Sequence, residues 1–205
     1  MRNFISENDI EQAILDKLRA KPFEYDVIVC DADPSKREAL PDGTGRASKR
    51  ECVLPDILLS SLKQINPTIE DQYLEQIVKD LCRDFTGTDM TATNYKLYQR
   101  LRNGIKITVR RNGKEDFDFV KLIDFDRPGN NTFTAVSQMW IQGRVYTLRP
   151  DILIFINGLP IVFASAPFFC SALFSIDLFS PINASAEPLF DIGSSMLRVP
   201  QGTKQ

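Results

Sequence analysis

The segment from Asp151 to Phe163 constrains the fold of this chain more than any other part of the sequence. Asp151 is followed by five consecutive apolar residues, and a second apolar run ends at Phe163. Between the two runs stands Asn157-Gly158, a pair that favours a tight turn because both residues tolerate positive φ. A strand that is apolar at every position is buried on both faces, so we expect it at the centre of a sheet. The segment therefore predicts a buried hairpin with a carboxylate at its open end.

The rest of the chain predicts helices first and strands later. Apolar residues recur at helical spacing in the first half, and β-branched and aromatic residues dominate the runs that follow. We expect helices over Ser6 to about Ala20, Pro55 to about Ile65, Thr68 to about Phe85 and Thr91 to Asn103, a long loop over Asp31 to Glu51, and strands over Tyr25–Cys30, Ile105–Arg110, Phe117–Phe125, Thr132–Ile141 and Asp151–Phe163. This order is typical of an α+β domain with helices packed on one face of a central mixed or antiparallel sheet, here an antiparallel meander.

The charge distribution divides the chain into two parts. Residues 164–205 contain five charged residues in 42, against 47 in residues 1–163. The later stretch is rich in Phe, Ser, Ala and Pro and follows neither helical nor strand spacing. We therefore expect one domain over residues 1–163 and an atypical low-charge tail over residues 164–205.

The composition excludes several kinds of chemistry. The chain has no histidine, which excludes Ser-His-Asp and Cys-His nucleophile systems and zinc sites that contain histidine. The four cysteines are too far apart in sequence to form the close pairs of a zinc site, and we expect reduced thiols: Cys30, Cys52, Cys82 and Cys170. Carboxylates, lysines and hydroxyls remain as reactive groups.

The uncharged stretch from Ile152 to Ile176 is the one candidate for a membrane span. Asn157, Gly158 and several prolines and serines divide it into short runs, and a hairpin explains its first half. The N-terminus shows no secretory apolar region. We expect a cytoplasmic protein without a membrane partner.

Asp151 itself has two explanations. Most carboxylates at strand ends reach water or a backbone N–H, and residue type alone favours that explanation. The alternative is a magnesium ligand at the end of the sheet, because Mg²⁺ prefers carboxylate oxygens.

The residues around Asp151 shift the balance toward the metal ligand. Arg149-Pro150-Asp151, five apolar residues and Asn157-Gly158-Leu159-Pro160 closely resemble the nuclease hairpin of the restriction (motor) subunit of type I restriction enzymes. The resemblance extends over residues 1–163 and is strongest over residues 131–163. It implies the PD-(D/E)xK nuclease fold, in which Pro-Asp is followed by Glu-x-Lys on the next strand. Here that fold is expected to be incomplete at the C-terminus.

The second half of the family motif is absent from this chain. By the resemblance, the family glutamate falls on Ser165 and the family lysine on Pro167. In the family, the two acids hold a Mg²⁺ that activates water, and the lysine assists the attacking water. Ser165 offers a neutral oxygen and Pro167 no polar side-chain group, so Asp151 is the remnant of the catalytic triad and of its metal site. We expect this chain to bind Mg²⁺ weakly or not at all and not to cleave DNA.

Hairpin geometry is consistent with this alignment. Residues directly opposite each other share a face of the sheet, so Asp151 and position 165 face each other only across a loop of odd length. We expect a three-residue loop over Asn157 to Leu159.

Glu7 and Glu11 are candidates for a further acid, because the resemblance implies that some nucleases of this fold take one from the first helix. They lie four residues apart and therefore on one helix face. The alternative is that both are exposed charges that complement the helix dipole, and it is the commoner situation.

One uninterrupted run of basic residues could contact DNA. Seven basic residues occur without an acidic one: Lys96, Arg100, Arg102, Lys106, Arg110, Arg111 and Lys114. With a net charge of −2, contact with nucleic acid needs such a local patch. A merely solvated face is an equally good explanation.

The resemblance predicts a fragment of the DNA-cleaving subunit of a type I restriction-modification system. Its partners would be double-stranded DNA and, in the full-length family, the specificity and methylation subunits. The alternative is a non-catalytic module for nucleic-acid binding or subunit assembly. The chain has no Gly-x-x-x-x-Gly-Lys-Ser/Thr motif, so we expect no ATP site. The loss of charge after Phe163 suggests a truncated family domain that arose by a shifted reading frame or a gene disruption. If the frame is shifted, translating the coding DNA in another frame after codon 163 should restore Glu-x-Lys.

Overall fold

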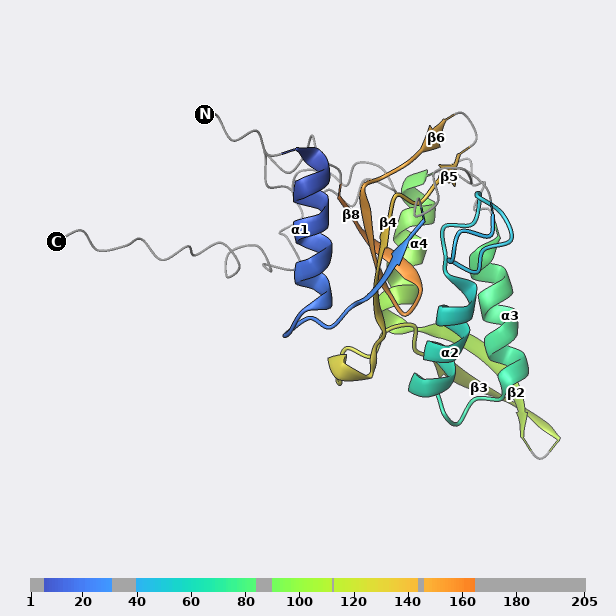
Figure 1. The fold of residues 1–205 in the computed structure, drawn as a ribbon. Helices are drawn as coiled ribbons and strands as arrows, with labels where there is room; N and C mark the ends of the chain where they lie inside the picture. The colour runs from blue at the N-terminus through green and yellow to red at the C-terminus, as the bar shows by residue number, and fades with distance from the viewer. Residues whose placement is uncertain (1–5, 31–39, 84–89, 112, 144–145, 165–205) are drawn as a thin grey trace, which may run out of the picture.

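The computed structural model describes residues 6–30, 40–83, 90–111, 113–143 and 146–164 (Figure 1). The predicted tail over residues 164–205 lies outside these ranges except for Ala164. The elements in chain order are α1 Glu7–Arg19, β1 Asp26–Val29, α2 Pro55–Ile65, α3 Asp71–Cys82, α4 Met90–Asn103, β2 Ile105–Arg111, β3 Lys114–Val120, the 3₁₀ turn η2 Pro128–Asn130, β4 Phe133–Ser137, β5 Ile141–Gln142, β6 Thr147–Leu148, β7 Ile152–Ile156 and β8 Leu159–Ala164. Among these residues no helix is long and apolar enough to span a bilayer.

The central sheet is mixed and has the strand order β1-β4-β7-β8. Strand β1 runs parallel to β4, whereas β4, β7 and β8 are antiparallel neighbours. The α+β class and the mixed sheet are therefore confirmed. The expected single meander is wrong, because β2 and β3 pair only with each other in a separate two-stranded sheet.

Helices cover both faces of the central sheet, not one face as expected from the sequence. Leu15 of α1 packs with Ala135 and Ile152 on one face. On the other face, Leu54 at the start of α2 packs with Leu153 and Phe155. Strand β7 is apolar at each position, so each of its faces needs a cover, as the continuous apolar run predicted.

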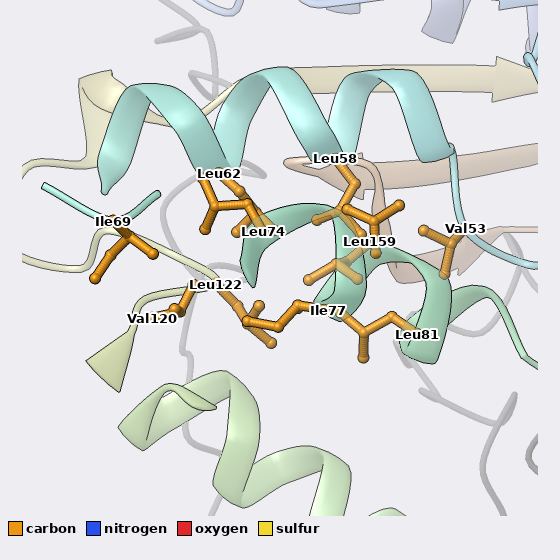
Figure 2. Packing of buried hydrophobic residues seen from close by; sticks show 11 residues of the cluster. Val53, Leu58, Leu62, Ile69, Leu74, Ile77, Leu81, Val120, Leu122 and Leu159 are labelled. Carbon is orange, nitrogen blue, oxygen red and sulfur yellow. The ribbon is translucent and has the colours of Figure 1, made fainter. Parts of the chain in front are cut away.

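A second core lies between α2, α3 and the β2–β3 sheet (Figure 2). Leu58 and Leu62 of α2 face Leu74 and Ile77 of α3, and Val120 packs beneath them. Helix α3 begins at Asp71 rather than at the predicted Thr68. The reason is a turn before the helix, in which the N–H of Ile69 donates to the carbonyl oxygen of Asn66 at 3.1 Å.

The β7–β8 hairpin has a two-residue turn, so the predicted three-residue loop is wrong. Asn157 and Gly158 have φ of 53° and 77°, as a tight hairpin turn requires. Phe155 pairs with Pro160, but Ile154 pairs with Val162, so Ile161 is the extra residue of a β-bulge. Beyond the bulge, Ile152 lies opposite Ala164. The bulge adds the one residue that the three-residue loop was expected to supply, so the pairing beyond it is the one expected from the sequence.

The turn is fixed to the rest of the fold through its backbone and its amide. The carbonyl oxygen of Gly158 accepts a hydrogen bond of 2.9 Å from the N–H of Leu54, just before α2. The side chain of Asn157 accepts from the N–H of Thr132 at 2.8 Å and donates to the carbonyl oxygen of Leu122 at 2.9 Å. The hairpin therefore cannot shift without breaking contacts to α2 and to the chain before β4.

The described part of the predicted loop over Asp31 to Glu51 is held by a buried arginine. The Arg46 side chain is inaccessible to solvent and pairs with Asp42 at 2.6 Å. It also donates to the carbonyl oxygens of Glu51 and Trp140, both at 3.0 Å. Residues 40–51 are thus attached to the end of the central sheet, which the loop composition did not predict.

Candidate active site

Asp151 lies directly before β7, beside the C-terminal end of β4. The two strands are antiparallel, and Ser137, the last residue of β4, pairs with Ile152. The next residue, Gln138, donates its backbone N–H to the carbonyl oxygen of Asp151 at 3.0 Å. Sheet pairing therefore places the side chains that follow β4 next to those that precede β7.

Glu11 of α1 reaches the same end of the sheet. Its side chain is buried, with 9% exposure, because α1 packs against β4 and β7. The Ser137 hydroxyl donates to Oε1 of Glu11 at 2.5 Å, and the Gln138 amide donates to Oε2 at 2.7 Å. Of the two helix acids considered from the sequence, Glu11 is the buried one and Glu7 is exposed.

Gln138 links the two carboxylates. Its side-chain nitrogen donates to Glu11 at 2.7 Å and lies 3.4 Å from Oδ1 of Asp151. Its backbone has a φ of 58°, which is uncommon for a residue other than glycine. Its buried Oε1 has no hydrogen-bond partner among the described residues. Unusual backbone and unmatched polar atoms of this kind are concentrated at functional sites.

A hollow of about 200 Å³ opens at these carboxylates. Its walls are formed by Glu7, Asn8, Ile10, Glu11, Gln138, Arg149 and Asp151. A second hollow shares several of these residues and extends to Gln12, Val29 and Ser137. Arg149 stands at the rim, where its guanidinium lies 5.4 Å from the centre of the Trp140 ring.

The hollow can attract a cation, but its ligand set is small. Two carboxylates held near one another by a neutral amide repel each other, and a divalent cation would neutralise them. Mg²⁺ is commonly held by one or two carboxylates and several waters, so the chemistry of Glu11 and Asp151 fits this ion. Within the described ranges, no three His, Cys, Asp or Glu side chains are grouped to hold a metal.

Comparison with known proteins places the chain in a family. A model of the family described as "Type I restriction enzyme R protein N terminus" matches residues 4–164. The chain belongs to this family. The HindI endonuclease subunit of a type I restriction enzyme from Haemophilus influenzae is 32% identical over 162 residues, which cover 77% of this chain and 14% of the relative. A putative type I endonuclease subunit, MjaIXP, from Methanocaldococcus jannaschii is 28% identical over 157 residues, 74% of this chain and 14% of the relative. The chain thus spans about one seventh of the length of these relatives.

The strand register relates the site to the family motif. The last described pair of the hairpin is Ile152 opposite Ala164. This register has the same parity as the pairing of Asp151 with position 165 that the sequence alignment predicts. Ser165 and Pro167, which replace the expected glutamate and lysine, lie outside the described residues.

The basic residues lie on another part of the domain. Lys96, Arg100 and Arg102 belong to α4, Lys106, Arg110 and Arg111 to β2, and Lys114 begins β3. In Figure 1 the β2–β3 hairpin extends on the side of the molecule away from α1. The returning strand supplies acids that the linear run lacks, and Arg111 pairs with Asp116 at 3.4 Å and Asp118 at 2.7 Å. Folding therefore neutralises part of the run locally.

Sequence reasoning missed Gln138, Ser137 and Arg149. Gln138 and Ser137 end the strand before the hairpin, and their proximity to Asp151 depends on the β4–β7 pairing. The available signal was the polar pair Ser137-Gln138 directly after the apolar residues Ala135 and Val136.

Proposed function

We propose that this chain forms the nuclease domain of the DNA-cleaving subunit of a type I restriction-modification system, with a PD-(D/E)xK fold, and that this copy does not cleave DNA. The observation that carries the proposal is the meeting of Asp151 and Glu11 at the end of the central sheet, beside a hairpin whose next positions hold Ser165 and Pro167. Family membership supports the role of the domain, and the side chains at these positions support the loss of chemistry.

Asp151 and Glu11 are the residues that would hold Mg²⁺ in the proposed site. When bound, the ion supplies charge neutralisation for the scissile phosphate and acidifies a water. Arg149 at the rim would attract a phosphate toward the hollow, because its charge is permanent.

This chain lacks side chains for two roles of the family motif, the second metal ligand and the lysine that assists the attacking water. A serine at position 165 adds no negative charge, so it holds a divalent ion far less strongly than a carboxylate would. A proline at position 167 has no group that can orient or deprotonate water. Binding of DNA without hydrolysis is therefore the expected behaviour.

A plasmid assay tests this proposal. Supercoiled DNA incubated with the chain and Mg²⁺ or Mn²⁺ should remain intact. Metal-dependent nicking that disappears in Asp151→Ala would contradict the proposed inactivity. The constructive test combines Ser165→Glu with Pro167→Lys, which should introduce nicking, while the matched control of Ser165→Gln with Pro167→Lys should not.

The second candidate function is a non-catalytic module for nucleic-acid binding or subunit assembly, favoured by the basic residues on α4 and β2. Duplex DNA, together with the specificity and methylation subunits of the family, would be its partners. Replacing Arg110 and Arg111 should reduce the salt dependence of DNA affinity, because each lost phosphate contact lowers the slope. Arg111 should contribute less than Arg110, since it is paired with two aspartates.

A further inference from the structure

The two faces of the β2–β3 hairpin differ in character. Directly opposed residues share a face, and Ile105 lies opposite Val120 while Ile107 lies opposite Asp118. On this face Val120 is fully buried, and Ile105 and Ile107 pack against the core between α2 and α3. The hairpin is therefore attached to the domain through one face.

The opposite face combines exposed rings with cations. Lys106 lies opposite Phe119, and Thr108 lies opposite Phe117. Both phenylalanines are 56% exposed. The ammonium of Lys106 lies 3.8 Å from the centre of the Phe117 ring. We call these four residues together with Arg110 the aromatic hairpin face.

Two exposed rings on one face are a candidate binding surface. A buried phenylalanine contributes 150–250 Å² of apolar contact, and two adjacent exposed rings form a contiguous apolar patch. Strand residues two apart lie roughly 6.6 Å from each other and point the same way. Phe117 and Phe119 therefore lie next to each other on the same face of the hairpin.

The charges beside the rings indicate the chemistry of that ligand. Lys106 and Arg110 supply two cations on this face, against one carboxylate from Glu115 opposite Arg110. A purely apolar partner would leave these cations without hydration or pairing, which is costly. A chain of phosphates that carries flat bases matches both components, as in proteins that bind single strands by stacking and charge.

We propose that the aromatic hairpin face binds an unpaired nucleic-acid strand, with bases stacked on Phe117 and Phe119 and phosphates near Lys106 and Arg110. This inference rests on the proposed DNA-related function and names the form of DNA that this surface takes. Duplex DNA offers little to the rings, because its base faces are already covered by neighbouring bases. The binding is expected to be tolerant of sequence, since every base has a flat face.

The test compares a fluorescent oligothymidine strand with a duplex of mixed sequence and equal length, by anisotropy with the whole chain. The variant Phe117→Thr with Phe119→Thr removes both rings and keeps a good strand former at each position. It should bind the unpaired strand at least tenfold more weakly, because stacking contributes roughly 1–3 kcal/mol per base. Its affinity for the duplex should change less than about twofold, a difference of under roughly 0.5 kcal/mol.

Two controls separate stacking from other effects. Tyr146→Thr removes a ring that is 75% exposed elsewhere and should leave both affinities unchanged. Phe117→Tyr with Phe119→Tyr keeps the rings and should retain strand binding. Circular dichroism verifies that each variant is folded.

Each outcome decides between the proposals. The proposed role of the aromatic hairpin face is wrong, and the proposed function stands, if the chain binds the duplex and not the unpaired strand. The same holds if the threonine variant loses affinity for both forms of DNA equally or for neither. If the tyrosine variant loses affinity for the unpaired strand, the claim that bases stack on the two rings is wrong. If the chain binds neither form of DNA, both proposals are wrong.

Discussion

Gly158 in the β7–β8 turn should be highly sensitive to substitution, and Gly113 in the β2–β3 turn is its matched control. Gly158 and Gly113 each follow an asparagine in the sequence and have φ of 77° and 75°. A Cβ on Gly158 would lie 2.6 Å from the carbonyl oxygen of Leu54 and 2.7 Å from the nitrogen of Leu58, both backbone atoms. A Cβ on Gly113 would meet nothing within 4 Å. The two positions share the conformational cost and differ in the steric one.

The magnitudes follow from this difference. Alanine in the left-handed region costs about 1 kcal/mol at either position, after allowance for the stiffer unfolded chain. At Gly158 the turn must also move away from α2, which costs about 1–3 kcal/mol as overpacking. The hydrogen bond from the N–H of Leu54 to the carbonyl oxygen of Gly158 is strained or lost, which costs about 1 kcal/mol more. We expect Gly158→Ala to lower the free energy of unfolding by about 3–5 kcal/mol and Gly113→Ala by about 1 kcal/mol.

Urea denaturation followed by circular dichroism measures both values. With a slope of about 2 kcal/mol per molar urea, the midpoint should fall by roughly 2 M for Gly158→Ala and by roughly 0.5 M for Gly113→Ala. Equal shifts in the two variants would refute the reasoning, because they would mean that the contact between the turn and the start of α2 contributes nothing. A large shift for Gly113→Ala would equally show that turn conformation alone dominates.

Two further predictions concern groups outside the candidate active site. Arg46→Met should destabilise the fold by about 3–5 kcal/mol in urea, because it leaves the buried Asp42 carboxylate without its cation, and Asp42→Asn should recover part of that loss. Burial alone raises the pKa of Asp42, but hydrogen bonds from Thr44 and Arg46 outweigh it and hold the pKa below its ordinary value. The stabilisation from the ionised Asp42 is present above the ordinary carboxyl range and disappears as pH falls through the lowered pKa. Acid unfolding monitored by fluorescence should therefore depend less on pH in Arg46→Met. Burial first, and then the charge of Glu51, raise the pKa of Cys82 to about 11. At pH 8 roughly a thousandth of this thiol is ionised, so iodoacetamide should modify it far more slowly than in the urea-unfolded chain, and equal rates by mass spectrometry would contradict the burial.

Local signals were sufficient for the elements that depend on neighbours in sequence. Ser6 caps α1 and exchanges hydrogen bonds with Asp9 three residues on, as its place before a helical run predicted. Gly104, with a φ of 78°, follows α4 at the predicted position. The buried strand β7 and the Asn157-Gly158 turn were also predictable, because apolar runs and turn residues specify them directly.

Long-range contacts could not be predicted in the same way. Arg46 bonds the carbonyl oxygen of Trp140, 94 residues away, and nothing in the composition of its loop indicates a buried cation. The sequence pattern of β2 and β3 does not differ from that of strands in the central sheet. Their packing against α2 and α3 is what separates them from that sheet. In both cases the decisive information is which distant surface the segment covers.

The sequence pointed to Asp151 directly but left the helix acid open between two positions. Glu7 and Glu11 share a helix face, so sequence alone left both as candidates. The structure brings Glu11 to Gln138 and leaves Glu7 at the outer wall of the hollow. This choice depends on how α1 sits on β4 and on the positive φ of Gln138, neither of which has a sequence signature.

The β-bulge at Ile161 sets the spacing between Asp151 and the residues that follow β8. With a two-residue turn and unbroken pairing, Asp151 would lie opposite position 164, and each residue of β8 beyond the present bulge would face the other side of the sheet. The bulge moves the register by one residue, so that Ile152 lies opposite Ala164, the last described pair of the hairpin. The spacing between the aspartate and the expected glutamate therefore includes the bulge as a structural part. A chain that keeps Asn157-Gly158 and this bulge therefore keeps the register that the proposed nuclease hairpin requires up to Ala164.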